Sequence, residues 1–181
     1  SVPARFLVDQ HHHLPQGKIL DVAAGSGRHA VWLAAQGYQV HAIDRNQEAL
    51  ESALTQSQAR QISTLTTQVI DLETNPQKAP SLGTNVYDGI IVFFYLFRPL
   101  FPSLIQALKP GGILLYETFL IDNHHHYQHP RRTEFCLNHN ELLSFNTSLR
   151  VLHYHEGIQE HDPADSQAPY TAQLVGQKPL A

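Results

Sequence analysis

Cysteine and methionine are scarce or absent in this sequence of 181 residues. Because Cys136 is its one cysteine, no internal disulfide can form, which fits a reducing compartment, and we expect a cytoplasmic location. The longest apolar run, 89–97, is about half of the roughly 20 residues that a membrane-spanning helix needs. We therefore expect no membrane association.

Basic residues are few and scattered. Of twelve Lys and Arg residues only Arg131 and Arg132 are adjacent, and the formal net charge is −4, so nucleic-acid binding is not expected. No signal segment precedes the first motif, and the sequence begins at Ser1 without any Met, so we expect a truncated N-terminal segment. Apolar types make up 42%, enough for one core, and we expect a single domain over 1–181.

Histidine is the one residue type in excess. Six of the thirteen histidines lie in two triplets, His11–His13 and His124–His126. Adjacent histidines lack the fixed spacing of metal ligands, and one cysteine is too few to complete a set. We expect solvated polar segments and no metal site.

Apolar strands and helices alternate along the chain, which predicts a parallel sheet covered on both faces. Five strands are expected at 18–22, 39–43, 64–70, 89–94 and 113–119. Helices are expected at 28–36, 47–60, 99–108 and 140–145, loops at 75–84 and 122–138, and a turn at 109–112. A closing β-hairpin is expected from 149–156 and 171–177.

A glycine-rich turn follows the first expected strand. Residues 25–30, Gly-Ser-Gly-Arg-His-Ala, fit the pattern G-x-G-x-x-A, and Asp44 lies nineteen positions after Gly25. Glycines let a ligand approach the backbone closely, and the later acid suits a ribose diol. Nicotinamide enzymes and S-adenosylmethionine enzymes share this pattern.

Asp21 helps to separate these two classes because it ends the strand directly before the glycine turn. A dinucleotide would place an anionic pyrophosphate there, and a carboxylate would repel it. The ammonium and sulfonium of S-adenosylmethionine would instead be attracted. The alternative is that Asp21 is a turn or capping residue.

Two further acids end expected strands at the same edge of the sheet, where open α/β sheets bind ligands. We expect Asp44 to accept both ribose hydroxyls. Asp71, with the backbone of Leu72, is expected to meet the adenine. Single acids at strand ends also serve as loop or capping residues, so this alternative stays open for both.

These motifs resemble those of class I S-adenosylmethionine-dependent methyltransferases, and most closely the small bacterial members related to tellurite-resistance proteins. The resemblance rests on the order of five segments: Asp21-Val22-Ala23-Ala24-Gly25-Ser26-Gly27, Asp44, Asp71, Tyr87-Asp88-Gly89-Ile90-Ile91 and Leu108-Lys109-Pro110-Gly111-Gly112. Ala23 stands where many members carry the first glycine. Segment 130–143 resembles the tail of that group, and 3–7 resembles part of its N-terminal segment.

The resemblance implies a Rossmann-like three-layer αβα sandwich with a mostly parallel seven-stranded sheet of order 3-2-1-4-5-7-6 and an antiparallel terminal strand. It implies S-adenosyl-L-methionine as the cofactor. The expected cofactor-binding residues are Asp21, Ala23, Gly25, Gly27, Asp44, Arg45, Asp71, Leu72 and Phe93.

The methyl acceptor is expected beyond the fourth and fifth strands. Phe93, Phe94 and Tyr95 follow the fourth, and the fifth carries Glu117 and Phe119. Aromatic rings there would surround the sulfonium and the acceptor, although core packing explains the phenylalanines equally well.

We expect Tyr95, Arg131 and Arg132 to contact the acceptor. The paired arginines favour a small anionic acceptor, or one with a soft nucleophilic atom, and a solvated loop is the alternative.

The sequence thus predicts methyl transfer from S-adenosylmethionine to an unidentified small-molecule acceptor, by in-line displacement. An NAD(P)-dependent oxidoreductase and a non-catalytic cofactor-binding module remain alternatives. The oligomeric state and the need for a general base are not determined by the sequence.

Overall fold

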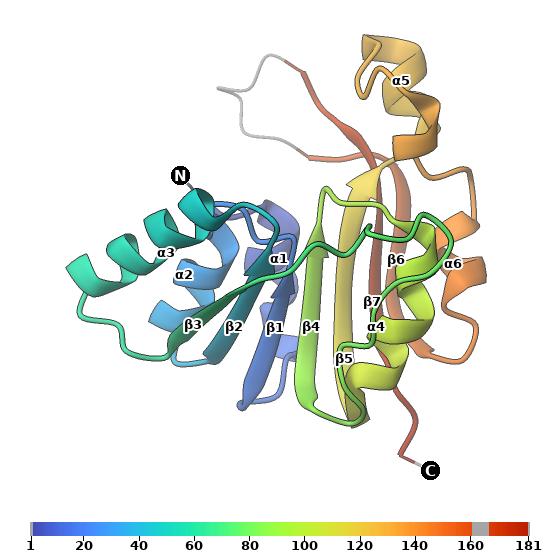
Figure 1. Ribbon diagram of the computed structural model, residues 1–181. Coiled ribbons are helices and arrows are strands. Elements are labelled where there is room, and N and C mark those ends of the chain that lie inside the picture. The colour runs from blue at the N-terminus through green and yellow to red at the C-terminus, as the bar shows by residue number, and fades with distance from the viewer. Residues whose placement is uncertain (1, 161–166, 181) are drawn as a thin grey trace.

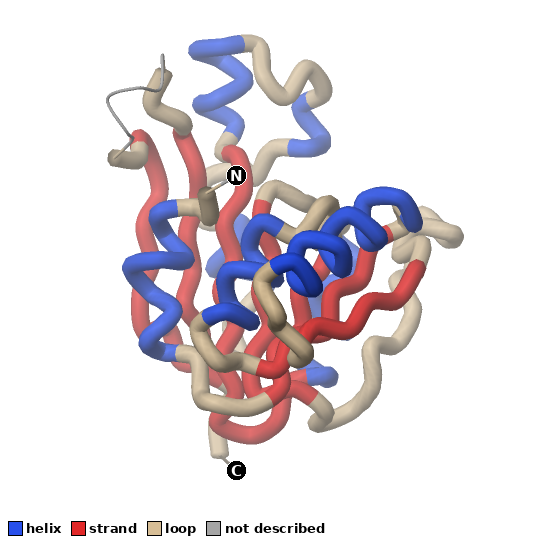
Figure 2. Tube along the Cα trace, turned by 90° about the vertical axis from the view of Figure 1, so that its left-hand side faces the viewer, coloured by secondary structure: helices blue, strands red, loops and turns tan. Residues whose placement is uncertain are grey.

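A seven-stranded mixed sheet with helices on both faces forms the centre of the protein (Figures 1 and 2). The computed structural model describes residues 2–160 and 167–180. The strand order is β3-β2-β1-β4-β5-β7-β6, and β7 alone runs antiparallel to its two neighbours, β5 and β6. This confirms the Rossmann-like fold and the strand order expected from the resemblance.

The strands are β1 (Lys18–Val22), β2 (Gln39–Asp44), β3 (Leu65–Val69), β4 (Tyr87–Phe93), β5 (Leu108–Phe119), β6 (Arg150–Ile158) and β7 (Tyr170–Gln177). The α-helices are α1 (Arg5–Gln10), α2 (Arg28–Ala35), α3 (Gln47–Ala59), α4 (Phe101–Ala107), α5 (Ile121–Tyr127) and α6 (Glu141–Phe145). Three short 3₁₀ helices, η1 (His11–His13), η2 (Arg98–Leu100) and η3 (Thr133–Phe135), complete the elements. Within the described ranges, none of the helices has the length and apolarity that crossing a membrane requires.

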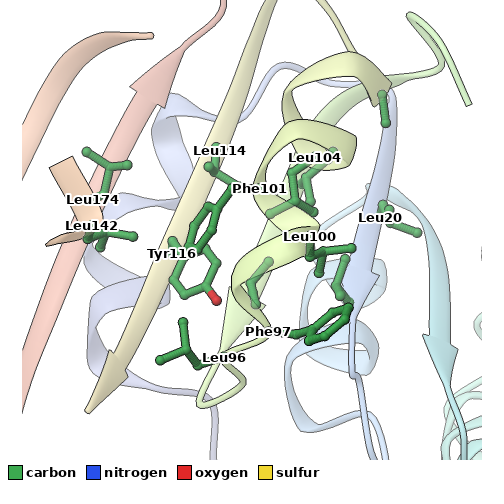
Figure 3. Close-up of a cluster of buried hydrophobic side chains, with 14 of the residues drawn as sticks. Leu20, Leu96, Phe97, Leu100, Phe101, Leu104, Leu114, Tyr116, Leu142 and Leu174 are labelled. Carbon is green, nitrogen blue, oxygen red and sulfur yellow. The ribbon is translucent and has the colours of Figure 1, made fainter. Parts of the chain in front are cut away.

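Each face of the sheet has its own apolar core, because buried residues of the central strands alternate between the two faces. One core joins the sheet to α4 and α6, and Figure 3 shows Tyr116 packed between the sheet and Phe101 of α4. The other core joins the sheet to α1, α2 and α3, and contains Phe6, Ile91 and Phe93. The central strands are therefore covered on both sides, and only their ends remain for binding.

The carboxyl ends of the parallel strands lie together at the upper edge of the sheet in Figure 1. Asp44 ends β2, Asp21 is the last residue but one of β1, and Phe93 ends β4. The helix α5 stands above β5 at this edge, whereas the C-terminal end of the chain lies at the opposite edge. The fold thus brings the expected site residues to one edge.

Several local expectations differ from the structure. The segment 122–138 was expected to be irregular, but α5 and η3 lie within or across it. Consecutive histidines are weak helix formers, so α5 depends on tertiary contacts. The buried Asn123 supplies them, because its side chain donates to the His129 carbonyl and accepts from the Tyr170 N–H. In addition, β5 starts at Leu108 and includes the expected turn at 109–112.

Candidate functional site

The turn after β1 has a left-handed backbone at three of its five residues. Ala23 has φ 56°, Gly25 φ 56° and Gly27 φ 84°, a region that side chains disfavour. A Cβ on Gly27 would lie 2.6 Å from Ala53 Cβ, whereas a Cβ on Gly25 would meet nothing within 4 Å. Gly27 therefore lets α2 pack closely on α3, and Gly25 leaves open space beside the backbone. Ala23 adopts a conformation that explains why glycine suits this position.

Asp44 is held in place by backbone amides from two directions. Gly25 N–H donates to Oδ2 at 2.9 Å, and Asn46 N–H donates to Oδ1 at 2.8 Å. The side chain is partly exposed, and it joins the end of β2 to the glycine turn. The carboxylate therefore has a fixed orientation and still has lone pairs for a ligand.

Asp21 is the most unusual polar group at this edge. Its side chain is 2% exposed, and Oδ2 has no hydrogen-bond partner among the described residues. Burial, with a smaller contribution from the nearby Asp44, raises the pKa of Asp21 to about 8, although the backbone of Ala30 and the charge of Arg28 oppose this rise. A buried unpaired oxygen destabilises the ligand-free protein, and a cationic ligand group would remove that penalty.

A pocket of about 330 Å³ opens at the ends of β1, β2 and β3. Its wall consists of Ala23, Asp44, Arg45, Ile70, Asp71, Leu72, Glu73, Tyr95 and Phe135. Asp71 accepts from the Glu73 N–H at 2.9 Å, and the Tyr95 hydroxyl donates to Glu73 Oε2 at 2.9 Å. The pocket thus combines acids that can accept hydrogen bonds with flat apolar surfaces, as a nucleoside requires.

The comparisons with known proteins bear on this arrangement. A family model described as tellurite resistance protein TehB matches residues 7–170. The chain belongs to the TehB family. Its match with a probable S-adenosyl-L-methionine-dependent methyltransferase TehB from Haemophilus influenzae is 26% identical over 167 residues, which are 88% of this chain and 55% of that protein. The chain thus spans about half the length of the curated TehB relatives that it matches.

Solved structures show the same fold. The crystal structure of TehB from Haemophilus influenzae aligns with a TM-score of 0.78 and 19% identity, over 97% of this chain and 62% of that one. A methyltransferase structure from Methanosarcina mazei aligns with a TM-score of 0.74 and 18% identity over the whole of both chains. These similarities establish the TehB-type fold.

Three of the residues expected to bind ligands in this TehB-family chain, Phe93, Arg131 and Arg132, do not line this pocket. The ring of Phe93 is 7% exposed and packs in the core between His29, at 4.3 Å between ring centroids, and Phe6, at 6.1 Å. The ring of Phe93 therefore belongs to the core between the sheet and helices α1, α2 and α3. Tyr95, expected to contact the acceptor, instead lines the same pocket as Asp44 and Asp71.

The arginine pair lies on the surface outside this pocket. Arg131 and Arg132 are exposed, and Arg132 forms an ion pair with Glu134 and lies over the ring of Phe135 at 5.4 Å. No hydrogen bond, ion pair or pocket among the described residues joins either arginine to the acids at the edge of the sheet. Their role as acceptor ligands stays a prediction.

Phe135 is a pocket residue that sequence reasoning missed. It belongs to η3, far along the chain from the glycine turn, and 45% of its surface is exposed. Nothing in the local sequence distinguishes it from any other exposed aromatic residue, because tertiary folding alone brings η3 over the pocket. Within residues 2–160 and 167–180, no three His, Cys, Asp or Glu side chains are placed to hold a metal ion.

Proposed function

We propose that this chain binds S-adenosyl-L-methionine at the carboxyl edge of β1, β2 and β3 and transfers its methyl group to a small molecule. Family membership supports the cofactor, because the curated TehB relatives are described as S-adenosyl-L-methionine-dependent. The observation that carries the proposal is the buried, unpaired Oδ2 of Asp21 next to the glycine turn. An ammonium is the complement that this oxygen requires.

The residues present fit the rest of the cofactor. The open space beside Gly25 would admit the methionine portion, and the oriented carboxylate of Asp44 would bind the ribose diol. The pocket that continues to Asp71 and Leu72 suits the adenine. When bound, the cofactor supplies an activated methyl group on a cationic sulfur.

A dinucleotide fits this edge less well. Its pyrophosphate would lie at the glycine turn, where the carboxylate of Asp44 would repel an anion and an anion would not help to ionise the buried Asp21. Arg28 is a nearby cation, and its charge lowers the pKa of both buried acids, Asp21 and Glu117. The electrostatics of the turn therefore favour a cationic ligand over a nicotinamide dinucleotide.

The protein contributes position and the exclusion of water. The glycine turn and Asp44 are fixed by hydrogen bonds within the chain, so the edge is largely organised before a ligand arrives. Holding two reactants in line replaces the entropy loss of a bimolecular encounter. The open aromatic rings at the end of β4 and β5 would limit solvent beside the methyl group.

Thermal unfolding with and without ligand tests the proposal. S-adenosylhomocysteine at a hundred times its dissociation constant is expected to stabilise the protein by about 2.7 kcal/mol, and NADH is expected to have no effect. Asp21→Asn should weaken the shift, and Glu51→Gln on the surface of α3 is the matched control. Stabilisation by NADH without any by S-adenosylhomocysteine would reject the proposal. Turnover with a panel of acceptors then separates an enzyme from a non-catalytic binding module.

A further inference from the structure

Two aromatic residues line the pocket, and they come from distant segments of the chain. Tyr95 lies between β4 and η2, and Phe135 belongs to η3. Arg98, the first residue of η2, connects the two segments, and its side chain is 31% exposed. The position of one aromatic wall relative to the other therefore depends on the contacts of this arginine.

The guanidinium of Arg98 binds the backbone on both sides of Phe135. Nη1 donates to the Glu134 carbonyl at 2.8 Å, and Nη2 donates to the Cys136 carbonyl at 2.9 Å. Because 45% of Phe135 is exposed, the packing of its own ring constrains it only weakly. Hydrogen bonds to the two flanking carbonyls fix the course of the backbone and so limit where the ring can lie.

Glu141, the first residue of α6, holds the guanidinium in this orientation. Arg98 Nε donates to Oε2 at 2.7 Å and Nη2 donates to Oε1 at 2.9 Å, which forms a bidentate pair. The hydrogen bond from Arg98 lowers the pKa of Glu141, so the carboxylate is ionised at neutral pH. The fork of Arg98 thus serves two carbonyls and one carboxylate together, which the point charge of a lysine cannot reproduce.

The segment that carries Arg98 is itself fixed to the sheet and to the opposite wall of the pocket. Tyr116, on β5 and 1% exposed, donates its hydroxyl to the Tyr95 carbonyl at 2.5 Å. The Tyr95 hydroxyl donates to Glu73 Oε2 at 2.9 Å, and both of these residues line the pocket. Tyr95 therefore has a defined position, and Arg98 extends from this fixed segment to the backbone of Phe135.

We propose that Arg98 is a positioning residue that sets the separation of Tyr95 and Phe135, and with it the fit of the pocket to the adenine of the cofactor. This rests on the proposed function, which assigns the adenine to this pocket. Arg98 is not among the described residues that line the pocket, so it acts through Phe135 and not on the ligand. Contacts between flat rings depend on their separation and tilt, which the orientation of η3 determines here.

A double-mutant cycle tests the proposal, with S-adenosylhomocysteine as the probe and calorimetry as the measurement. Arg98→Lys keeps the positive charge beside Glu141 but loses the fork. It should lower the affinity about threefold to fivefold, and by less than about 1.5-fold in a protein that already carries Phe135→Ala. Arg60→Lys, at the end of α3, makes the same chemical change away from the pocket and should leave the affinity unchanged.

A fluorescence measurement separates the position of the ring from the strength of binding. Trp32 is the one tryptophan of the sequence, so Trp32→Phe with Phe135→Trp leaves a single indole, at the pocket. Stacking on adenine should quench its emission, and at saturating S-adenosylhomocysteine this quench no longer depends on affinity. Arg98→Lys should reduce the quench at saturation. Asp44→Ala should weaken binding and leave the quench at saturation unchanged.

The outcomes separate this proposal from the proposed function. If wild type fails to bind S-adenosylhomocysteine, the proposed function fails and the positioning role fails with it. If wild type binds, the positioning role alone is overturned by unchanged affinity in a folded Arg98→Lys protein, by an effect that persists in full beside Phe135→Ala, or by an unchanged quench. A lower free energy of unfolding with unchanged affinity would show that Arg98 serves stability only. Glu141→Gln, which releases the guanidinium from its carboxylate, takes the place of Arg98→Lys in the same cycle if that protein does not fold.

Discussion

The two halves of the carboxyl edge are built by different means. On the β1–β3 half, Asp44 is oriented by Gly25, nineteen residues away, through a backbone amide. On the β4–β7 half, Glu117 is oriented by side chains 54 and 56 residues away on β7. The first half is thus set by a short motif and its own backbone, and the second by the assembly of distant strands.

This difference teaches how one fold serves many acceptors. A turn held by backbone hydrogen bonds tolerates changes of neighbouring side chains, so the half proposed to bind the cofactor can stay constant. The carboxylate of Glu117, in contrast, loses its orientation when Thr171 or Gln173 is replaced, because these two side chains donate its hydrogen bonds. Specificity for the acceptor is therefore expected to vary through β5, β7 and the segment between α5 and α6, without loss of cofactor binding.

The largest effect of a substitution is expected at the glycine turn. Gly27→Ala combines a left-handed backbone with a contact of 2.6 Å to Ala53 Cβ. We expect a loss of about 3 kcal/mol in the free energy of unfolding, measured by denaturant titration. Gly25→Ala is the matched control, because its Cβ meets nothing within 4 Å, and it should lose only about 1–2 kcal/mol. Equal losses would contradict the packing role of Gly27.

Asp44→Ala tests whether the β1–β3 half of the edge binds the cofactor. The change removes an anionic acceptor from the ribose and from two backbone N–H groups. Affinity for S-adenosylhomocysteine should fall roughly 10- to 150-fold by calorimetry, equivalent to about 1.5–3 kcal/mol. Glu117→Gln should show no such loss. Wild-type affinity in a folded Asp44→Ala protein would remove Asp44 from the site.

Asp21 makes the stability of the β1–β3 half depend on pH. A pKa of about 8, above the ordinary 3.8, means that the ligand-free folded protein holds a proton that the unfolded chain has lost. The stability due to this proton is present at low pH and is lost as the pH rises toward 8, by up to about 1.4 kcal/mol per unit. Asp21→Asn should flatten the slope in denaturant titrations between pH 5.5 and 7.5.

The protonation of Asp21 also affects the affinity for the ligand. An ammonium binds the ionised form of Asp21, so affinity for S-adenosylhomocysteine should rise with pH by up to about tenfold per unit below pH 8. Calorimetry in buffers of different ionisation enthalpy should show proton release on binding. Binding without proton release and without pH dependence would place the ammonium elsewhere.

Phe135 links the two halves, because the segment after β5 carries it into the pocket beside Asp44 and Asp71. Phe135→Ala removes an aromatic face from the proposed adenine site, and the expected loss is about fivefold in S-adenosylhomocysteine affinity. Phe94→Ala, on the acceptor half, should change this affinity less. A larger loss of affinity in Phe94→Ala than in Phe135→Ala would show that the two halves of the edge do not bind separate ligands.

The sequence predicted the β1–β3 half of the edge better than the β4–β7 half, because short motifs form the first. The glycine turn and the acids at the ends of β1 and β2 follow from short motifs in the sequence, whereas the strand order was implied by the family resemblance. The sequence left open whether Phe93 packs in the core or faces a ligand, since the surroundings of a strand residue depend on the sheet register and on the helices that cover it. Nor did it place Phe135 in the pocket or Thr171 on Glu117, because such contacts arise only when distant segments come together.

The amide proton of Ala4 is one of the contacts that connect the N-terminal segment to this edge. Ala4 N–H donates to His29 Nε2 at 3.0 Å, and burial lowers the pKa of His29 to about 3, so the ring is neutral and its proton lies on Nδ1. The exchange of the Ala4 proton with deuterium requires the segment to lift from α2. Its protection factor therefore reports, at one peptide bond, the fraction of molecules in which that side of the edge is open.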